Sequence, residues 1–348
     1  MIGHLSRRCG GRLLLGLSVA VALTGASGAS FGAGFSLEDK PGEHLDVLLG
    51  GRVVARYMYA YDTSSPERRF ETYKPYLHVF DAEGTRPITN GPAGLYPHHR
   101  GIFIGWSRLG FQGRSCDLWG MGGGDMVHQG FRDRHASAHQ ASFTALVRWN
   151  AKTGETILEE YRTITVRPAA KPCRLVIDFV STLSAPRSEV ALGGDPEHAG
   201  VHYRPANELD KARTLYVFPR EKADPRVDLD YPWVGESYTL AGRRHSVVLM
   251  NHPENPKGTK YSAYRDYGRF GAFFVGSVRP SQPLTLRYRF LVADGEMPEA
   301  EVIQKCWDEF AGVKGPSPVP KTTVIPVASR PAEKGKAKAP GKPAARAK

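Results

Sequence analysis

The 348-residue chain is poor in cysteine, has no acidic residue in its first 33 positions, and has no long apolar run in its body. Its four cysteines lie far apart, which excludes the dense disulfide framework of a small stapled domain. The body has no run approaching 18 apolar residues, which excludes a protein built from long membrane-spanning helices. We therefore expect no transmembrane segment once a leader is removed.

The acid-free segment 1–33 has the layout of a cleavable secretory signal peptide. Three arginines precede the apolar stretch 13–23, and a run of small residues follows it. Cleavage is expected between Ala26 and Ala33, and the arginine pair leaves both the Sec and the twin-arginine export routes open. We therefore expect an exported protein, periplasmic or extracellular, that does not use the diffusible nucleotide cofactors of the cytoplasm.

The positive charge is concentrated at the two ends of the chain. The formal net charge is +12, of which the segment from Gly312 onward contributes +8 and the leader +3. The body is therefore close to neutral, so the high pI does not predict a specific nucleic-acid partner. The tail 312–348 is rich in Pro, Ala and Lys and lacks aromatic residues, which predicts disorder and allows contact with an anionic envelope.

Three cysteines remain after the leader: Cys116, Cys173 and Cys306. The sequence leaves two states of these cysteines open: one disulfide bridge with one free thiol, or three free thiols.

Alternating apolar residues dominate the body and predict strands at 52–61, 143–149, 174–183 and 284–292. One helix is predicted near the C-terminal end, with Pro298 in its first turn and Gly312 after its end. We therefore expect an all-β fold, a large antiparallel β-sandwich with a short C-terminal helix. The expected domains are a signal peptide at 1–33, one sandwich at 34–311 and a tail at 312–348.

The densest group of chemically active residues lies between Tyr96 and Phe131, in YPHHRGIFIGW and CDLWGMGGGDMVHQGF. Strand alternation places Gly101, Phe103 and Gly105 on one face, and interior glycines often mark the close approach of a ligand or another backbone. The same alternation separates His98 from His99 unless the chain turns there. The glycine cluster at 120–124 matches no nucleotide-binding motif and predicts a loop beside the site.

Further histidines and arginines occur in HAGVHYRPAN, LMNHPENP and YRDYG. Neutral imidazoles suit both proton exchange near neutral pH and metal ligation, whereas aromatic rings, Arg and carboxylates suit polyhydroxylated ligands. His135 and His139 have helical metal-ligand spacing but lack the Glu of a zinc-protease motif, so we expect them at the surface.

The motifs YPHHRGIFIGW, DLWG, HYRPAN, LMNHPENP and YRDYG, with the closing strand LTLRYRFLV, resemble the bacterial family labelled PmoA-like over roughly residues 40–311. The label comes from a membrane subunit of methane monooxygenase, which the absence of long apolar spans makes physically implausible here. The resemblance implies clustered His and Arg positions at His98, His99, Arg100, His128, His202 and His252. The expected sandwich is also similar in plan to galactose-mutarotase-like supersandwiches, which handle sugars.

These patterns lead to one main functional hypothesis and two alternatives. The main hypothesis is an exported enzyme that acts on a sugar or glycoside by His and carboxylate acid–base chemistry, through hydrolysis, elimination or epimerisation. The alternatives are a His-ligated divalent metal site for hydrolysis, elimination or oxygen chemistry and a noncatalytic glycan-binding module. No cofactor is certain.

The residues assigned to these roles fall into three groups. The expected catalytic residues are His99, His128, His252, Asp117 and Asp266. The expected substrate-binding residues are His98, Arg100, Trp106, Trp119, His202, Arg204, Arg265 and Tyr267. The ligands of a metal, if one binds, are expected among His98, His99, His128, His202 and His252.

Overall fold

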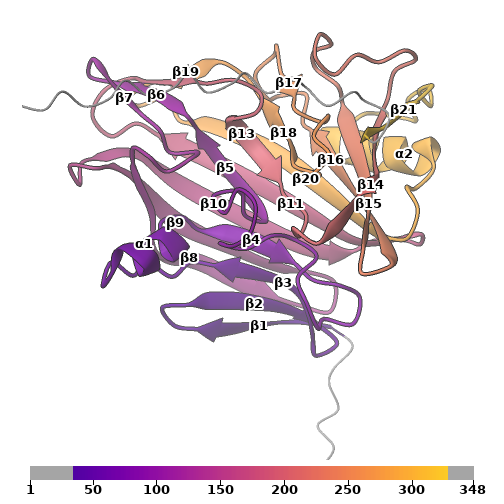
Figure 1. The fold of residues 1–348 in the computed structure, drawn as a ribbon, viewed down its shortest axis with the longest axis horizontal. Coiled ribbons are helices and arrows are strands. Elements are labelled where there is room, and N and C mark those ends of the chain that lie inside the picture. The colour runs from indigo at the N-terminus through magenta and orange to yellow at the C-terminus, as the bar shows by residue number, and fades with distance from the viewer. Residues whose placement is uncertain (1–33, 328–348) are drawn as a thin grey trace, which may run out of the picture. The chain divides into compact units, whose positions relative to one another are not determined.

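The computed structural model describes residues 34–327. The predicted signal peptide at 1–33 lies outside this part, and so does the tail from 328 onward. The described chain is dominated by antiparallel strands in three sheets, with two short helices (Figure 1). The predicted antiparallel β-sandwich is therefore confirmed. Neither of the helices in residues 34–327 has the length and apolar character needed to cross a bilayer.

The largest sheet has nine strands in the order β21-β14-β15-β16-β20-β11-β10-β9-β8. Its strands are β8 (Gly124–Ala136), β9 (Ala141–Ala151), β10 (Thr156–Pro168), β11 (Cys173–Ser184), β14 (Leu209–Phe218), β15 (Trp233–Leu240), β16 (Arg243–Asn251), β20 (Leu284–Asp294) and β21 (Thr323–Pro326). The strands predicted at 143–149, 174–183 and 284–292 lie in β9, β11 and β20.

The second sheet has eight strands in the order β1-β2-β3-β4-β5-β13-β18-β17. They are β1 (Phe35–Lys40), β2 (His44–Leu49), β3 (Arg52–Met58), β4 (Tyr76–Val79), β5 (Ile102–Trp106), β13 (Ala199–Tyr203), β17 (Lys260–Tyr261) and β18 (Phe270–Phe273). A four-stranded sheet, in the order β19-β12-β6-β7, contains β6 (Arg108–Phe111), β7 (Arg114–Cys116), β12 (Val190–Gly193) and β19 (Gly276–Val278). The strand predicted at 52–61 ends at Met58.

The main core lies between the inner faces of the two large sheets. Ile102 and Ile104 of β5 share one apolar cluster with Phe143 of β9, Ile177 of β11 and Phe290 of β20. Burial of each such side chain contributes about 1.5–3 kcal/mol relative to exposure, before cavity effects. Period-2 alternation thus leaves the opposite face of β5 available for other residues.

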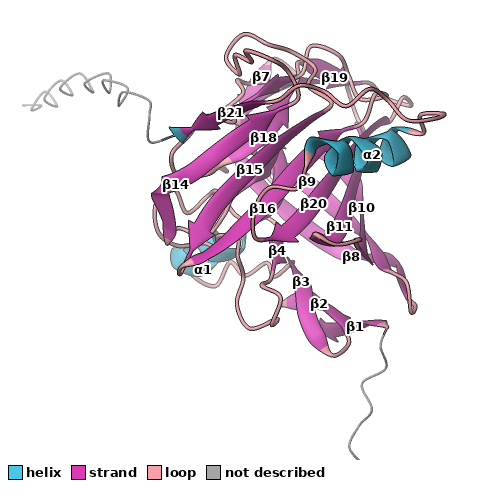
Figure 2. Ribbon diagram, turned by 90° about the vertical axis from the view of Figure 1, so that its right-hand side faces the viewer, coloured by secondary structure: helices cyan, strands magenta, loops and turns pink. Residues whose placement is uncertain are grey.

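The helix α2 (Ala300–Ala311) covers the outer face of the nine-stranded sheet (Figure 2). Ile303 of α2 packs with Trp233, Met250 and Leu291 in a second apolar cluster. Gly312 ends the helix in the left-handed conformation, φ 66°, as predicted. Pro298 precedes the N-cap Glu299 and so lies outside the first turn, which differs from the prediction.

Helix α1 (Pro66–Thr72) was not predicted from the sequence, because its signal is short. The Ser65 side chain accepts a hydrogen bond from the backbone N–H of Arg68 at 3.2 Å, and Pro66 occupies the first helical position. Ser followed by Pro is a typical helix start. The seven-residue helix is too short for a periodic apolar pattern to be recognised.

The segment after α2 also differs from the prediction. Residues 323–326 form β21, which pairs antiparallel with β14 from Leu215↔Pro326 to Phe218↔Thr323. The ordered body therefore extends beyond Ala311, and the disorder predicted from Gly312 onward does not apply to these residues. The cysteines Cys116, Cys173 and Cys306 are all free.

Candidate functional site

The candidate site lies on the face of β5 and β13 that is turned away from the main core. Phe103 of β5 pairs with His202 of β13, and their rings stack at 5.5 Å between centroids. Both side chains are fully buried although they do not belong to the main core cluster. The predicted alternation of GIFIGW, with Phe103 opposite the isoleucines, is therefore confirmed.

The loop between β7 and β8 crosses this face and brings Trp119 onto it. The Asp117 Oδ1 accepts hydrogen bonds from the backbone N–H of Trp119 at 3.0 Å and of Gly120 at 2.7 Å. A Cβ on Gly105 would lie 2.3 Å from the Leu118 carbonyl oxygen, so this strand position requires glycine because another backbone passes over it. Asp117, predicted as catalytic, therefore shapes the Trp119 loop.

A turn brings the two adjacent histidines to Trp119. The backbone N–H of His99 donates to the Tyr96 carbonyl at 2.9 Å, which reverses the alternation that would place His98 and His99 on opposite faces. Their ring centroids lie 4.2 Å apart, and they lie 5.4 Å and 4.9 Å from Trp119. Tyr96 and Tyr267, 5.0 Å apart, form an aromatic wall beside His99.

His99 is buried, with 3% of its surface exposed, yet neither ring nitrogen has a hydrogen-bond partner among residues 34–327. The Trp119 Nε1–H is likewise buried and unpaired among those residues. Burial lowers the pKa of His99 far below its ordinary value, and the positive charge of Arg269 lowers it further. A neutral imidazole and an indole N–H thus offer two donors and one acceptor in one buried location.

His202 and Arg269 form the floor of the site. The His202 Nε2 is 2.8 Å from the Ala199 carbonyl, and the Nδ1 is 3.3 Å from Arg269 Nη1. Because a carbonyl only accepts and a guanidinium only donates, His202 is neutral with its proton on Nε2. Burial lowers the pKa of His202, and the nearby Arg269 lowers it further, in agreement with this tautomer.

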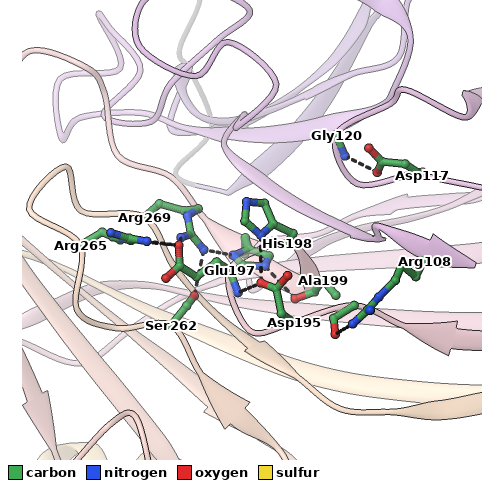
Figure 3. Close-up of polar contacts among 12 residues, drawn as sticks. Arg108, Asp117, Gly120, Asp195, Glu197, His198, Ala199, Ser262, Arg265 and Arg269 are labelled. Carbon is green, nitrogen blue, oxygen red and sulfur yellow. Dashed lines mark hydrogen bonds and ion pairs between the residues drawn. The ribbon is translucent and has the colours of Figure 1, made fainter. Parts of the chain in front are cut away.

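The β12–β13 loop contributes His198 and the carboxylate that orients it. The Asp195 Oδ1 is 2.9 Å from His198 Nδ1, and the side chain of His198 is 53% exposed (Figure 3). The His198 ring lies 5.2 Å from Trp119. A carboxylate on Nδ1 leaves the lone pair of Nε2 for a substrate, and no hydrogen bond within residues 34–327 reaches that nitrogen.

Glu197 joins this loop to the segment before β18. Its carboxylate binds Arg265 and accepts a hydrogen bond from the Tyr264 hydroxyl at 3.0 Å. Burial raises the pKa of Glu197, but the hydrogen bond and charge of Arg265 outweigh burial, so the pKa is lowered overall. Figure 3 shows Glu197 between Arg265 and Arg269. Glu197 is therefore an ionised structural partner of the two arginines.

Lys74 is buried between the Trp119 loop and the Phe103 ring. Its Nζ donates to the Trp119 carbonyl at 2.8 Å and lies 4.1 Å from the Phe103 ring centroid. Burial lowers the pKa of Lys74 well below its ordinary value, and the charge of Arg100 lowers it further. Lys74 therefore anchors the Trp119 loop from inside the protein.

Three residues that were predicted to bind substrate contact other parts of the protein instead. Arg100 is fully buried and donates to the carbonyls of Phe70, Glu71 and Pro97. Trp106 points into the main core, where its ring lies 6.0 Å from that of Trp149. Arg204 donates to the Tyr267 carbonyl and to Asn207. Arg100 and Arg204 thus hold the loops of the site, and none of the three faces Trp119.

Three predicted catalytic residues are not brought to this site. His128 packs against Tyr59 and Phe131, with centroids at 4.5 Å and 4.6 Å. His252 contacts Phe310 of α2 and lies near Glu254. Asp266 is exposed and forms an ion pair with Lys211 at 3.4 Å. Sequence alternation places residues on faces, but it does not determine which faces of distant strands meet, so these assignments to a shared site are corrected.

The three-histidine metal site is also not assembled. No three His, Cys, Asp or Glu side chains are grouped to hold a metal ion within the described part of the chain. His98, His99 and His202 surround Trp119, whereas His128 and His252 have the other neighbours given above. The residues present therefore do not fit the metal site expected from the sequence.

Several residues of the site carry weak signals in the sequence: the Asp195–His198 pair, Glu197, Arg269 and Lys74. Asp195, Glu197, Arg269 and Lys74 were not proposed, and His198 was noted only as a neighbour of His202. The segment DPEHAG contains a usable signal, because Asp three residues before His in a loop allows a side-chain hydrogen bond. Lys74 and Arg269 carry no such local signal, since their role comes from contacts distant in sequence.

The fold and the site define an antiparallel β-sandwich with a His-rich aromatic site on the outer face of one sheet. The chain belongs to a family of unknown function, DUF6807, whose profile matches residues 44–308. The match carries no activity with it, and the PmoA-like resemblance stays a prediction. No curated protein sequence matches the chain.

Thirty-five chains of solved structures match this chain, and they include the following three. The heparan sulfate lyase HepC from Pedobacter heparinus has 10% identity and a TM-score of 0.36, over 77% of this chain and 36% of that one. A β-arabinopyranosidase has 10% identity and a TM-score of 0.36, over 70% of this chain and 39% of that one. The GalM/aldose epimerase homologue from C. elegans has 10% identity and a TM-score of 0.34, over 76% of this chain and 99% of that one.

The chain thus spans less than two fifths of the first two of these proteins. At these TM-scores the likeness carries no argument about the chemistry of the site.

Proposed function

We propose that the protein is an exported carbohydrate-active enzyme in which His198, oriented by Asp195, transfers a proton to and from a sugar. The observation that carries this proposal is the 2.9 Å contact of Asp195 Oδ1 with His198 Nδ1 beside the Trp119 ring. A carboxylate on one imidazole nitrogen fixes the tautomer and stabilises the imidazolium that forms when the other nitrogen accepts a proton. His198 replaces the histidines expected from the sequence as the proton-transfer group.

The aromatic surroundings support a sugar as the ligand. Tyr96 is 42% exposed and, together with Tyr267 and the edge of Trp119, presents apolar ring surface next to polar groups. Sugars have apolar C–H faces and a rim of hydroxyls, so rings beside an imidazole and an indole N–H match both features. The buried His99 nitrogens and the Trp119 Nε1 have no hydrogen-bond partner among residues 34–327, and we propose that substrate hydroxyls bind them.

The carboxylates of the site favour proton transfer by imidazole over hydrolysis by two carboxylates. Asp195 orients His198, Asp117 binds backbone N–H groups, and Glu197 is held by Arg265 and Tyr264. Most glycosidases need two carboxyl groups free to face the glycosidic bond. We therefore infer elimination or epimerisation: the His198 Nε2 accepts a proton from the sugar, becomes an imidazolium beside Asp195, and returns the proton to leaving group or product.

The test compares matched histidine variants on a panel of glycans. His198→Ala is expected to lower kcat by about 10²–10⁴-fold, the usual contribution of a general base, and Asp195→Asn is expected to lower it less. His128→Ala and His252→Ala are the controls and are expected to retain wild-type turnover. Full activity of His198→Ala would refute the proposed base. Binding of a glycan without any chemical change would favour a noncatalytic binding module instead.

Export is a separate part of the proposal with its own measurement. It rests on the arginines, apolar stretch and small residues of segment 1–33. Expression in a Gram-negative host followed by N-terminal sequencing is expected to give a periplasmic protein that begins between residues 26 and 34. A full-length cytoplasmic protein would contradict it.

A further inference from the structure

The charge of Arg269 is the most unusual feature of the site. Arg269 is only 1% exposed, and a buried cation is costly unless it is paired and fully hydrogen-bonded. The nearest carboxylate oxygen, Glu197 Oε2, is 3.8 Å from Arg269 Nη2. That carboxylate is already bound by Arg265 and Tyr264.

The remaining partners of Arg269 are neutral. Its Nη1 donates to Ser262 Oγ at 3.0 Å and to His202 Nδ1 at 3.3 Å, and its Nη2 donates to the Tyr267 hydroxyl at 3.4 Å. Its Nε is buried and has no hydrogen-bond partner among residues 34–327. The guanidinium therefore has one shared, distant carboxylate and three neutral contacts, two of them long.

Within the same cluster, His99 and Trp119 each have buried polar atoms without partners in the described chain. They lie 4.9 Å apart at the ring centroids, and the Arg269 guanidinium carbon is 5.9 Å from the Trp119 ring centroid. The unsatisfied polar atoms are therefore gathered around a single ring. They include the Trp119 indole donor, the Arg269 guanidinium donor and the nitrogens of neutral His99.

We infer that the sugar bound at this site is anionic and that its carboxylate or sulfate group binds Arg269 next to Trp119. This inference rests on the proposed function, since it names the substrate class of the same site. The anion replaces the long contact of Arg269 with the Tyr267 hydroxyl. The Tyr267 side chain is partly exposed, and the residue lies in a loop directly before Gly268, which has a φ of +77°. Side-chain rotation of this kind is common on binding.

The geometry of the guanidinium supports this choice of ligand. A planar guanidinium binds carboxylate or sulfate oxygens through two parallel N–H groups, and such charge-assisted bonds are about twice as strong as neutral ones. Arg265, on the opposite side of the Glu197 carboxylate, adds a second positive charge to the same region. A neutral sugar hydroxyl would leave the shared Glu197 carboxylate, at 3.8 Å, as the nearest counter-charge of Arg269 among residues 34–327.

The test uses pairs of oligosaccharides that differ only in charge. Binding of the full-length protein is measured by calorimetry with oligosaccharides of galacturonic, mannuronic and glucuronic acid, each beside its carboxyl-reduced counterpart. O-sulfated maltotriose and maltotriose form the second pair and distinguish sulfate from carboxylate as the source of the charge. We expect the acidic member of at least one pair to bind at least about tenfold more tightly, the gain of one charge-assisted contact.

Variants then assign the preference to Arg269. Arg269→Gln is expected to reduce the acidic-to-neutral affinity ratio to about one, whereas Arg269→Lys retains the charge and part of the ratio. Arg243→Gln, an exposed ion-pair partner of Glu83, removes the same charge elsewhere and is expected to leave the ratio unchanged. If Arg269→Gln does not fold, the Lys variant and the wild-type pairs still decide the result.

Two outcomes separate the failure of this inference from the failure of the proposed function. Equal binding of charged and neutral members, or an unchanged ratio in the Arg269 variants, overturns the anionic substrate and leaves a carbohydrate enzyme intact. Absence of binding and turnover with every sugar overturns the proposed function and this inference together.

Discussion

Two groups of histidine and aromatic residues in this protein have similar composition but different surroundings. The first is the Trp119 cluster, made of His98, His99, Phe103, Trp119, His198 and His202. The second is the His128 cluster, made of Tyr57, Tyr59, His128, Phe131 and Phe143.

Both clusters contain a buried imidazole nitrogen without a partner in the described chain. Only the Trp119 cluster adds a half-exposed histidine on a carboxylate and a buried arginine whose nearest carboxylate is shared with a second arginine. Histidine among aromatic rings is common to both clusters, so the proposed chemistry rests on these additional groups.

The charges beside the His128 cluster serve stability. Arg162 and Glu160 are fully buried and form an ion pair at 2.8 Å, and Trp149 Nε1 donates to Glu160 at 2.8 Å. Each nitrogen of Arg162 and each carboxylate oxygen of Glu160 has a hydrogen-bond partner, so the two charges compensate each other within the protein. Arg269 differs because its nearest carboxylate, Glu197, lies 3.8 Å away and is also bound by Arg265.

The largest expected effect on stability comes from breaking this buried pair. Glu160→Gln is expected to lower the free energy of unfolding by about 3–5 kcal/mol, because it leaves the Arg162 charge uncompensated. Urea unfolding followed by circular dichroism measures the change. Glu159→Gln is the matched control on the same strand; its partner Arg148 is partly exposed, so a loss below about 1 kcal/mol is expected. Equal losses in the two variants would contradict the contrast.

A smaller effect concerns the pH dependence of the His128 cluster. Burial, and then the charge of Arg162, lower the pKa of His128 to about 4. An unfolded histidine has a pKa near 6.5, so between pH 6.5 and 4 the unfolded state binds the extra proton, and stability falls as pH falls.

Removal of the imidazole in His128→Phe is expected to abolish this component. The stability of the variant relative to wild type is therefore expected to rise by about 1–3 kcal/mol between pH 7 and pH 4. Urea unfolding at the two pH values measures this difference, and NMR titration of the His128 ring gives its pKa directly. A measured pKa near 6.5 would show that the cluster does not exclude the charged form.

The smallest effect is expected at Asp266, a residue assigned to catalysis from the sequence. Its side chain is 53% exposed and pairs with Lys211 at 3.4 Å, so Asp266→Asn is expected to change stability by less than about 0.5 kcal/mol. Turnover is expected to equal that of the wild type. A large loss of turnover would move the catalytic centre from His198 toward the exposed side of the Tyr267 loop.

The sequence predicted much of the fold because alternation is a local property. Leu286, Tyr288 and Phe290 repeat at period 2, and this spacing places them on one face of β20 whatever the neighbouring strands are. Gly105 was recognised as a position of close approach for the same local reason. The short helix α1 and the pairing of β21 were missed, because the first has only seven residues and the second depends on a distant strand.

The site was predicted only in part because its meeting points are tertiary. The sequence by itself placed Phe103 opposite the isoleucines of one strand and proposed His98, His99, Trp119 and His202 as site residues. Only the tertiary structure decided that a turn at Pro97 brings the first two histidines together and that the Trp119 loop crosses β5. It also placed His198 on the site and His128 and His252 elsewhere. The physical reason is that periodicity determines the face of a strand, whereas contacts between loops distant in sequence determine which faces share a site.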